Sequence, residues 1–535
     1  MTDSSASGYT PDYWRYLRNL GINLSAPETE KITQILAATN WEEPQSGLDC
    51  NNLGVLALIG AEESETGQER DAFLAMAIDI LEQGASEHSL CAAHLALIHS
   101  MIGEGSQAVN LSQIHLQAVL QRRYQPDLDE PHGLIYLSSI TQYLSDYQQE
   151  VLHELLIAAD GYEQTLRLLV EVLLRSHMVF YNIHTLPSLH LAAHVCPQSA
   201  SIKLRLGLAC LANNQLEGLV YLQQAWQAKL SDYAVLQSLH LICRDMRDMT
   251  QSQYWHQLAQ QHSIDSLHWR WTELPVDSSY TWLPFDHNIL LAVEPSLRSI
   301  VTDVLLAEGE WFEPELEFWR NQVQPGMVVI DVGANAGIYS FSTAARVGET
   351  GRVVAVEPFP QCVDLLIQTC QQNQFTWVDI YAGAASDREG QIYLSLHQAS
   401  ELNEVVAEAS TEDLAAGKVQ AVPCATLDSL CDRYNLQRVD LLKIDAEGHE
   451  LQVLQGSLQI LKEFAPIILY ENIAGSRGGN VPVAEFLQAH GYQLFRYQPY
   501  LQKLLPVTLV DVQNSAYLNL IALPKSSSTG DKGGN

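Results

Sequence analysis

The chain has 535 residues, of which 47% are hydrophobic and 17% are charged, and this is the composition of an ordinary globular protein. Its length exceeds what one compact core usually holds, so we expect two or three domains. The formal net charge of −34 opposes binding to phosphate backbones and to anionic lipid surfaces. We therefore expect neither a nucleic acid nor a membrane as a partner.

The start of the chain and its cysteines favour a reducing compartment. The first residues, MTDSSASGYTPDYW, contain neither a basic stretch nor an apolar core, so we expect no secretion signal. The longest apolar run, from Leu53 to Ala61, is far shorter than the roughly 20 residues of a membrane helix. The nine cysteines include no C-x-x-C pair, which is typical of reduced thiols. We therefore expect a cytoplasmic protein.

Helical periodicity dominates residues 1–265. The segments 51–84, 92–121 and 203–230 each place an apolar helix, a break and a second helix in succession. They resemble degenerate tetratricopeptide-like (TPR-like) repeats. Small residues stand where stacked helices would approach closely, among them Gly54, Ala93 and Gly207. We expect an all-α helical-repeat domain that either binds a protein partner along a concave face or only packs on its neighbour.

Four histidines of this domain raise the question of a metal site: His177, His184, His190 and His194. The last two are four residues apart and would share one face of a helix. No glutamate follows His190 to complete an H-E-x-x-H motif. We interpret all four as ordinary helix histidines.

The pattern changes after residue 265. Residues 266–290 are rich in prolines and aromatic residues and are predicted to be a linker. From 291 to 524, strands alternate with helices, which predicts a parallel α/β sheet covered by helices on both faces. The strands are expected at 327–332, 352–357, 377–384, 391–396, 439–445 and 466–471. Residues 525–535 are predicted to be a disordered tail.

A glycine-rich loop follows the first of these strands, in the order Asp331-x-Gly333-x-Asn335-x-Gly337. Glu357 ends the next strand, where an acid can accept hydrogen bonds from both hydroxyls of a ribose. A nicotinamide enzyme and an S-adenosylmethionine enzyme both fit a glycine loop followed by an acid. The side chain of Asn335 favours S-adenosylmethionine, because a pyrophosphate needs unobstructed helix amides. Asp331 could then receive the donor's ammonium group.

Two later strands bring further polar groups to the same edge. The segment VDLLKIDAEGHELQVLQG (439–456) ends a buried strand at Asp445, and a helix opens around Glu447 and Gly448. The segment APIILYEN (465–472) delivers Glu471 and Asn472. Ligands of such sheets bind at the carboxyl ends of the strands, so we expect the site here.

These segments carry a resemblance to a known family. DVGANAGIYS, AVEPFP, AASDREG, TLDSL, LLKIDAEGHELQVLQG, IILYEN and HGYQLFRY stand in the order and spacing of FkbM-type methyltransferases, over about residues 288–524. The resemblance implies a Rossmann-like class I fold, S-adenosylmethionine as methyl donor, and an oxygen of a sugar, glycan or other small hydroxylated metabolite as acceptor. The helical half lies outside it.

The resemblance also implies roles for single residues. Asp331, Gly333, Asn335 and Gly337 would hold the methionine part of the donor. Glu357 would hold the ribose, and Ser386 would lie near the adenine. His449 departs from the family, where a small residue is common in the corresponding EGAE.

For catalysis, the candidate bases are Asp445, His449 and Glu471, and we favour Asp445. A Mg²⁺ ion on Asp445, Glu471 and Asn472 is an alternative that we do not favour, since magnesium leaves a weak sequence signature. The glycines of 474–482 permit a mobile flap, in which Arg477 could contact an acidic acceptor.

A function of another class stays open. The α/β half could be a catalytically silent methyltransferase-like module, with the helical half acting as a scaffold. The intact Asp331, Gly333 and Glu357 argue against this alternative.

Overall fold

The computed structural model describes residues 12–122, 130–138, 146–176, 181–229, 232–262, 270–286, 289–397, 403–406, 410–472, 479–514 and 517–525. His177, Arg477 and all but the first residue of the expected tail lie outside these ranges. The chain divides into two compact units. Unit 1 comprises Met1–Leu239 with Pro499–Gln502, and unit 2 comprises His240–Gln498 with Lys503–Asn535.

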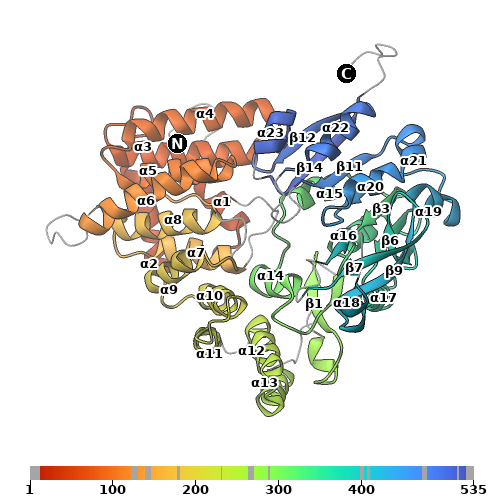
Figure 1. Cartoon of the computed structure of the whole chain (residues 1–535). Coiled ribbons are helices and arrows are strands. Elements are labelled where there is room, and N and C mark those ends of the chain that lie inside the picture. The colour runs from red at the N-terminus through yellow and green to blue at the C-terminus, as the bar shows by residue number, and fades with distance from the viewer. Residues whose placement is uncertain are drawn as a thin grey trace. The chain divides into compact units, whose positions relative to one another are not determined.

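Unit 1 is a helical array. Its helices are α1 (Tyr13–Asn19), α2 (Ala26–Ala38), α3 (Gly47–Glu63), α4 (Gly67–Gly84), α5 (Ser89–Met101), α6 (Gly105–Arg122), α7 (Asp146–Leu156), α8 (Gly161–Arg175), α9 (Leu186–Val195), α10 (Ala200–Ala212), α11 (Gly218–Ala228) and part of α12 (Tyr233–Asp245). The three expected helix pairs are α3–α4, α5–α6 and α10–α11, and α3, α4 and α5 lie side by side in Figure 1. A Cβ at Gly54 would lie 2.6 Å from the Leu81 side chain, and one at Gly207 would lie 2.8 Å from Leu222. The predicted close approach at these two glycines is confirmed.

One segment of unit 1 is neither helix nor strand but is buried. It comprises residues 130–138, of which Leu134 to Leu137 are at most 1% exposed. Side chains replace the backbone partners that a sheet would supply, as burial of peptide groups requires. They come from Tyr13 and Tyr16 of α1, Asn51 and Asn52 of α3, His94 of α5 and Gln164 of α8.

Three of the four histidines lie within the described residues: His184, His190 and His194. His184 and His194 are exposed. The ring of His190 lies instead beside Tyr221, and ligand atoms of His190, Cys210 and Glu217 lie within 4.8 Å of one another. The interpretation of these histidines as ordinary stays a prediction.

Unit 2 begins earlier than the sequence pattern suggests. It includes the end of α12 and all of α13 (Met249–His262). The segment 266–290, which was expected to be a linker, contains the 3₁₀ helix η1 (Trp271–Glu273), the strand β1 (Thr281–Phe285) and the start of β2 (Ile289–Val293). Trp271 is 2% exposed, with ring centroids 5.3 Å from those of both His240 and His256. The aromatic residues that interrupt the helical period therefore fill a core, and the linker interpretation is wrong for these residues.

The main sheet has eight strands in the order β13-β12-β14-β11-β10-β3-β4-β5. Its parallel strands are β3 (Val328–Val332), β4 (Arg352–Glu357), β5 (Val378–Ala382), β10 (Leu441–Ile444) and β11 (Ile467–Glu471). The strands β12 (Tyr492–Gln498), β13 (Lys503–Pro506) and β14 (Asn519–Pro524) are antiparallel to their neighbours. The sheet is therefore mixed, not wholly parallel.

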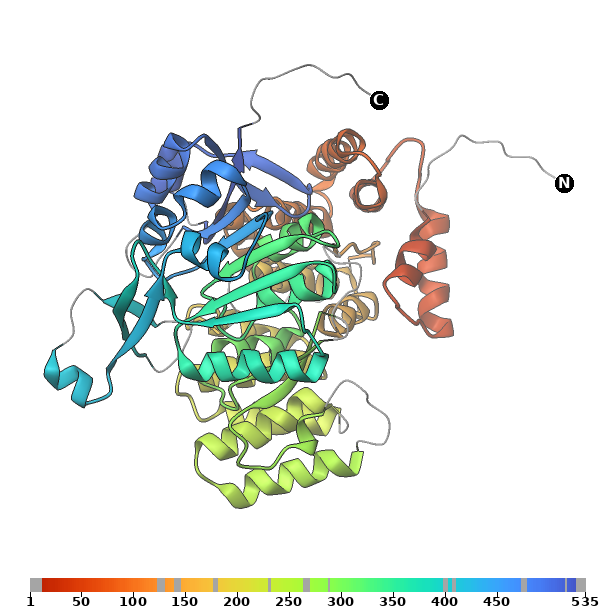
Figure 2. The same ribbon diagram turned by 90° about the vertical axis from the view of Figure 1, so that its right-hand side faces the viewer.

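A second sheet accounts for the strand expected at 391–396. It has the order β6-β9-β7-β8, with β6 (Ala384–Ala385), β7 (Gly390–Ser395), β8 (Glu404–Val406) and β9 (Val419–Ala425). β7 pairs antiparallel with β8 and β9. In Figure 2 these strands project from the main sheet, with the short helix α18 (Thr411–Ala415) at their tip. The turn at 386–390 is too short for a crossover helix, so β7 could not join the parallel strands.

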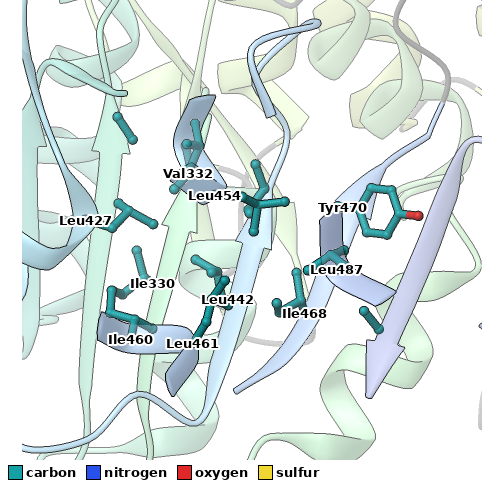
Figure 3. Packing of buried hydrophobic residues seen from close by; sticks show 14 of the residues in the cluster. Ile330, Val332, Leu427, Leu442, Leu454, Ile460, Leu461, Ile468, Tyr470 and Leu487 are labelled. Carbon is teal, nitrogen blue, oxygen red and sulfur yellow. The ribbon is translucent and has the colours of Figure 1, made fainter. Parts of the chain in front are cut away.

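Helices cover the main sheet and complete its core. They are α14 (Ile300–Glu308), α15 (Glu315–Gln322), α16 (Ile338–Val347), α17 (Pro360–Asn373), α19 (Leu427–Arg433), α20 (Glu450–Gln455), α21 (Leu458–Glu463), α22 (Val481–Ala489) and α23 (Leu509–Asn514). Figure 3 shows Ile330, Leu442 and Ile468 of three adjacent strands packed against Leu454 and Leu461. This rigid core fixes the carboxyl ends of β3, β10 and β11 relative to one another.

All nine cysteines are free thiols. Among the described residues, no helix combines the length and the apolarity needed to span a membrane.

Candidate active site

The glycine loop after β3 is pressed against the end of β10. Gly333 has a φ of +75°, and a Cβ at this position would lie 1.7 Å from the carbonyl oxygen of Asp445. Its N–H donates to the carbonyl of Val356 at 3.0 Å, which ties the loop to β4 as well. Only glycine meets both the conformation and the space. The carboxyl ends of β10, β3 and β4 are thereby gathered at one place.

Asp331 and Lys443 face each other across β3 and β10, where they are register partners. Asp331 is 1% exposed; its Oδ2 accepts from the Ser340 hydroxyl at 2.6 Å, while its Oδ1 has no partner. Burial raises the pKa of Asp331, and the nearby ammonium of Lys443 acts against that rise. Burial acts to lower the pKa of Lys443, but the carboxylates of Asp445, Asp331 and Glu313 outweigh it and the pKa lies above its usual value.

Glu357 is buried at the carboxyl end of β4. Its Oε2 accepts from the N–H of Asn335 and its Oε1 from the N–H of Phe359, each at 2.8 Å. Each oxygen therefore keeps a second lone pair for a ligand. Burial raises the pKa of Glu357 to about 7, although these two hydrogen bonds act to lower it. The Oδ1 of Asn335 accepts from the N–H of Ala336 at 2.7 Å, so this oxygen stabilises the glycine loop from within.

His449 contacts Ser386, although the two residues are far apart in the sequence. Nε2 of His449 lies 3.0 Å from the Ser386 hydroxyl, which is fully buried at the end of β6. Burial lowers the pKa of His449, so its ring is neutral near pH 7. The sequence predicts Ser386 near the adenine of the donor and His449 as a candidate base for the acceptor. In the structure, the two side chains contact each other.

Three carboxylates converge where β10 and β11 end. Asp445, Glu447 and Glu471 each offer an oxygen within 4.8 Å of the others. The Nζ of Lys443 donates to Oδ2 of Asp445 at 2.7 Å. Glu471 is 7% exposed and its Oε2 has no partner. Burial raises the pKa of Glu471, and Asp445 and Glu447 raise it further.

Asn472, by contrast, forms hydrogen bonds with backbone groups. Its Nδ2 donates to the carbonyl of Tyr517 at 2.9 Å, and its Oδ1 accepts from the N–H of Asn480 at 3.1 Å. Both ends of the amide are occupied, and the residue is fully buried. Glu447 thus stands where the sequence interpretation had Asn472.

Glu447 is placed by a rigid loop. It has a φ of +47°, a conformation uncommon for a non-glycine residue. Oε1 of Glu450 accepts from the N–H groups of Ala446 and Gly448 on either side, at 3.1 and 2.9 Å, and its Oε2 accepts from Asn480. The acid-rich motif after Asp445 signals this residue, since it is part of IDAEGHE.

Glu313 is a further buried acid that the sequence did not single out. Its Oε2 accepts from the Tyr339 hydroxyl at 2.6 Å and from Asn519 at 3.0 Å. Tyr339 also lies under the ammonium of Lys443, with Nζ 4.6 Å from the ring centroid. No motif marks Glu313, because its partners come from distant parts of the chain.

Comparison with known proteins bears on this arrangement. Residues 331–494 match the family model of the methyltransferase FkbM domain. This part of the chain is similar to the methyltransferase FkbM domain. The matched segment contains every site residue named so far except Glu313, Tyr517 and Asn519. The family is one of methyltransferases.

The chain is also similar to solved structures. They include the methyltransferase FkbM from Methylobacillus flagellatus KT, at 15% identity over 43% of this chain and 54% of that one, with a TM-score of 0.25. Another is a SAM dependent methyltransferase from Aquifex aeolicus, at 15% identity, 39% and 88% coverage and a TM-score of 0.23. A third is an rRNA methylase from Streptococcus thermophilus, at 11% identity, 39% and 93% coverage and a TM-score of 0.23. The chain spans about half the length of the first, and no curated protein matches it.

Proposed function

We propose that unit 2 transfers a methyl group from S-adenosylmethionine to a hydroxyl oxygen of a sugar, a glycan or another small hydroxylated metabolite. The observation that carries the proposal is the buried carboxylate of Glu357, which faces the glycine loop and accepts only one backbone hydrogen bond at each oxygen. This is the arrangement that a ribose diol can complete. A net charge of −34 supports a small acceptor over a nucleic acid.

The donor would be held by residues at the ends of β3, β4 and β6. Gly333 and Gly337 let the loop approach it, and Asp331 has a buried oxygen without a partner that suits an ammonium group. Asn335 stabilises the loop through its Oδ1. Ser386 would lie near the adenine, and its contact with His449 supports a place for that histidine near the donor. When bound, the sulfonium donor supplies an already activated methyl group.

The acceptor would lie against the carboxylates at the ends of β10 and β11. In-line transfer requires that the acceptor oxygen be aligned and its proton removed. Asp445 is our choice of base, because Lys443 orients its carboxylate from a buried position. Glu471 is the second candidate, since it is buried beside Asp445. His449 stays a weaker third candidate because its Nε2 faces Ser386.

The helical unit is proposed to be a TPR-like array with a protein partner. We also propose that the chain is cytoplasmic, which its nine free thiols support. The alternative of a silent module in a scaffold protein would require a donor site that no longer binds.

Two measurements test the proposal. Calorimetry of the full chain with S-adenosylmethionine should give one binding site, and no binding would leave the scaffold alternative. Labelled donor with fractionated hydroxylated metabolites should then give a labelled product.

A pair of variants tests the choice of base. Asp445→Asn should lower turnover by about 10²–10⁴-fold, whereas Asp364→Asn, an exposed residue of α17, should leave turnover unchanged. Equal turnover in both variants would remove Asp445 as the base.

A further inference from the structure

We propose that Asp445, Glu447 and Glu471 bind one hard divalent cation of the Mg²⁺ class. Their ligand oxygens lie within 4.8 Å of one another. Two oxygens on an octahedral Mg²⁺ are about 3 to 4 Å apart, given metal–oxygen distances of roughly 2.0–2.1 Å. Small side-chain movements would therefore close the three carboxylates around an ion. The sequence had offered Asn472 as the third ligand, and the structure supplies Glu447 in its place.

An unpartnered buried oxygen points to a ligand at this place. Glu471 is 7% exposed, and its Oε2 has no hydrogen-bond partner. Burying a carboxylate oxygen without a partner is costly, and such groups are almost always satisfied by a neighbour, a water or an ion. Glu471 offers a carboxylate oxygen to the cluster with Asp445 and Glu447, so a cation between the three residues would satisfy this carboxylate.

The local charge agrees with a divalent ion. The three carboxylates carry −3 when ionised, and the ammonium of Lys443 supplies +1. Lys443 donates to Oδ2 of Asp445 at 2.7 Å, so we assign the other oxygen of Asp445 to the cation. The remaining −2 equals the charge that one divalent cation neutralises.

The loop that carries Glu447 is held in place without a cation. The left-handed conformation of Glu447 is maintained by the two backbone hydrogen bonds that Glu450 accepts on either side of it. A strained residue that its surroundings hold in place is typical of a ligand site. All three ligands are carboxylates, which favours Mg²⁺, Mn²⁺ or Ca²⁺ over softer metals.

Asp445 and Glu447 are half-buried, which leaves coordination positions for water or for an acceptor oxygen. If the proposed function holds, a cation here would polarise the acceptor hydroxyl and lower its pKa, and it would take over the role that the proposed function gives to Asp445 as base. Binding of the ion itself does not depend on methyl transfer, so it is measured without donor or acceptor.

The test uses the full chain, treated with EDTA and dialysed. Mn²⁺ is titrated in, and the signal of the free ion is followed by electron paramagnetic resonance at moderate ionic strength. We expect one Mn²⁺ per chain, displaced by Mg²⁺. Glu471→Gln and Glu447→Gln should each weaken binding by more than about tenfold. Glu412→Gln, an exposed residue of α18, should bind as the parent chain does.

Thermal unfolding separates binding from misfolding. Mg²⁺ should raise the Tm of the parent chain but not that of Glu471→Gln, while circular dichroism shows that the variant is folded. Absence of a saturable Mn²⁺ site, or equal Mn²⁺ affinity in all variants, would overturn the inference. A chain that binds S-adenosylmethionine but no Mn²⁺ refutes the cation site alone, and one that binds Mn²⁺ but no donor refutes the proposed function alone.

Discussion

The carbonyl oxygen of Asp445 occupies the space that a side chain at Gly333 would need, because a Cβ there would lie 1.7 Å from it. The glycine loop and the end of β10 are therefore in direct backbone contact. Any displacement of Asp445 moves the loop, and any side chain on the loop moves Asp445.

Gly333→Ala tests this contact. The substitution combines a left-handed backbone, which costs a non-glycine residue about 1–2 kcal/mol, with a steric overlap that only backbone movement can relieve. We expect loss of donor binding in calorimetry and a lowered Tm. Gly309→Ala is the matched control: its φ is +69°, but a Cβ there meets nothing within 4 Å. Equal effects of the two substitutions would show that the contact with Asp445 is unimportant.

The pKa of Glu357, about 7, predicts that donor affinity depends on pH. Hydroxyl donors bind the ionised carboxylate, so affinity should rise as the pH increases from about 6 to 8. Glu357→Gln should bind more weakly, by about 1.5–3 kcal/mol for each charge-assisted hydrogen bond lost, and its affinity should not change over this range. Calorimetry across the range decides, and an identical pH profile in both proteins would contradict the assignment.

The same shift affects stability without donor. Because the folded-state pKa of Glu357 lies above the ordinary value of 4.5, its contribution to stability is fully present below about pH 4.5 and is lost as the pH rises through about 7. Raising the pH from 6 to 8 should therefore lower the free energy of unfolding less in Glu357→Gln than in the parent chain. Denaturant titrations at the two pH values measure this difference.

Gln164 forms a hydrogen bond with the buried segment 130–138 of unit 1. Its Oε1 accepts from the N–H of Gly133 at 3.0 Å, and its Nε2 donates to the carbonyl of Leu155 at 3.2 Å. Gln164→Leu removes these partners from buried groups, so unfolding should become easier by about 1–3 kcal/mol for each group left unsatisfied. Gln83→Leu, at an exposed position of α4, should have little effect. Denaturant unfolding of both variants gives the comparison.

The predicted domain limit at residue 265 can be tested with fragments. We still expect residues 1–265 to form a helical array by themselves. In such a fragment, however, α13 lacks Trp271, which contacts both His240 and His256. Limited proteolysis should cut 1–265 within 249–262 faster than it cuts 1–280, which keeps η1. Equal protection of both fragments would mean that α13 does not need Trp271 for its stability.

The sequence by itself determined most of the elements and the position of the glycine loop. Alternation of apolar residues predicted β3, β4, β10 and β11, and chain order together with the rule for parallel sheets brought Asp331, Glu357 and Asp445 to one edge. Each of these inferences depends on neighbours along the chain or on a motif, so one sequence is sufficient for them.

The tertiary structure decided which side chains meet. The pairing of β10 with β3 puts Lys443 opposite Asp331. The sequence of one strand alone does not specify its register with a neighbour. Glu450 fixes the left-handed loop that turns Glu447 toward Glu471, while Asn472 is taken up by the backbone near Tyr517 and Asn480. These choices depend on distances between segments remote in sequence, which periodicity cannot encode.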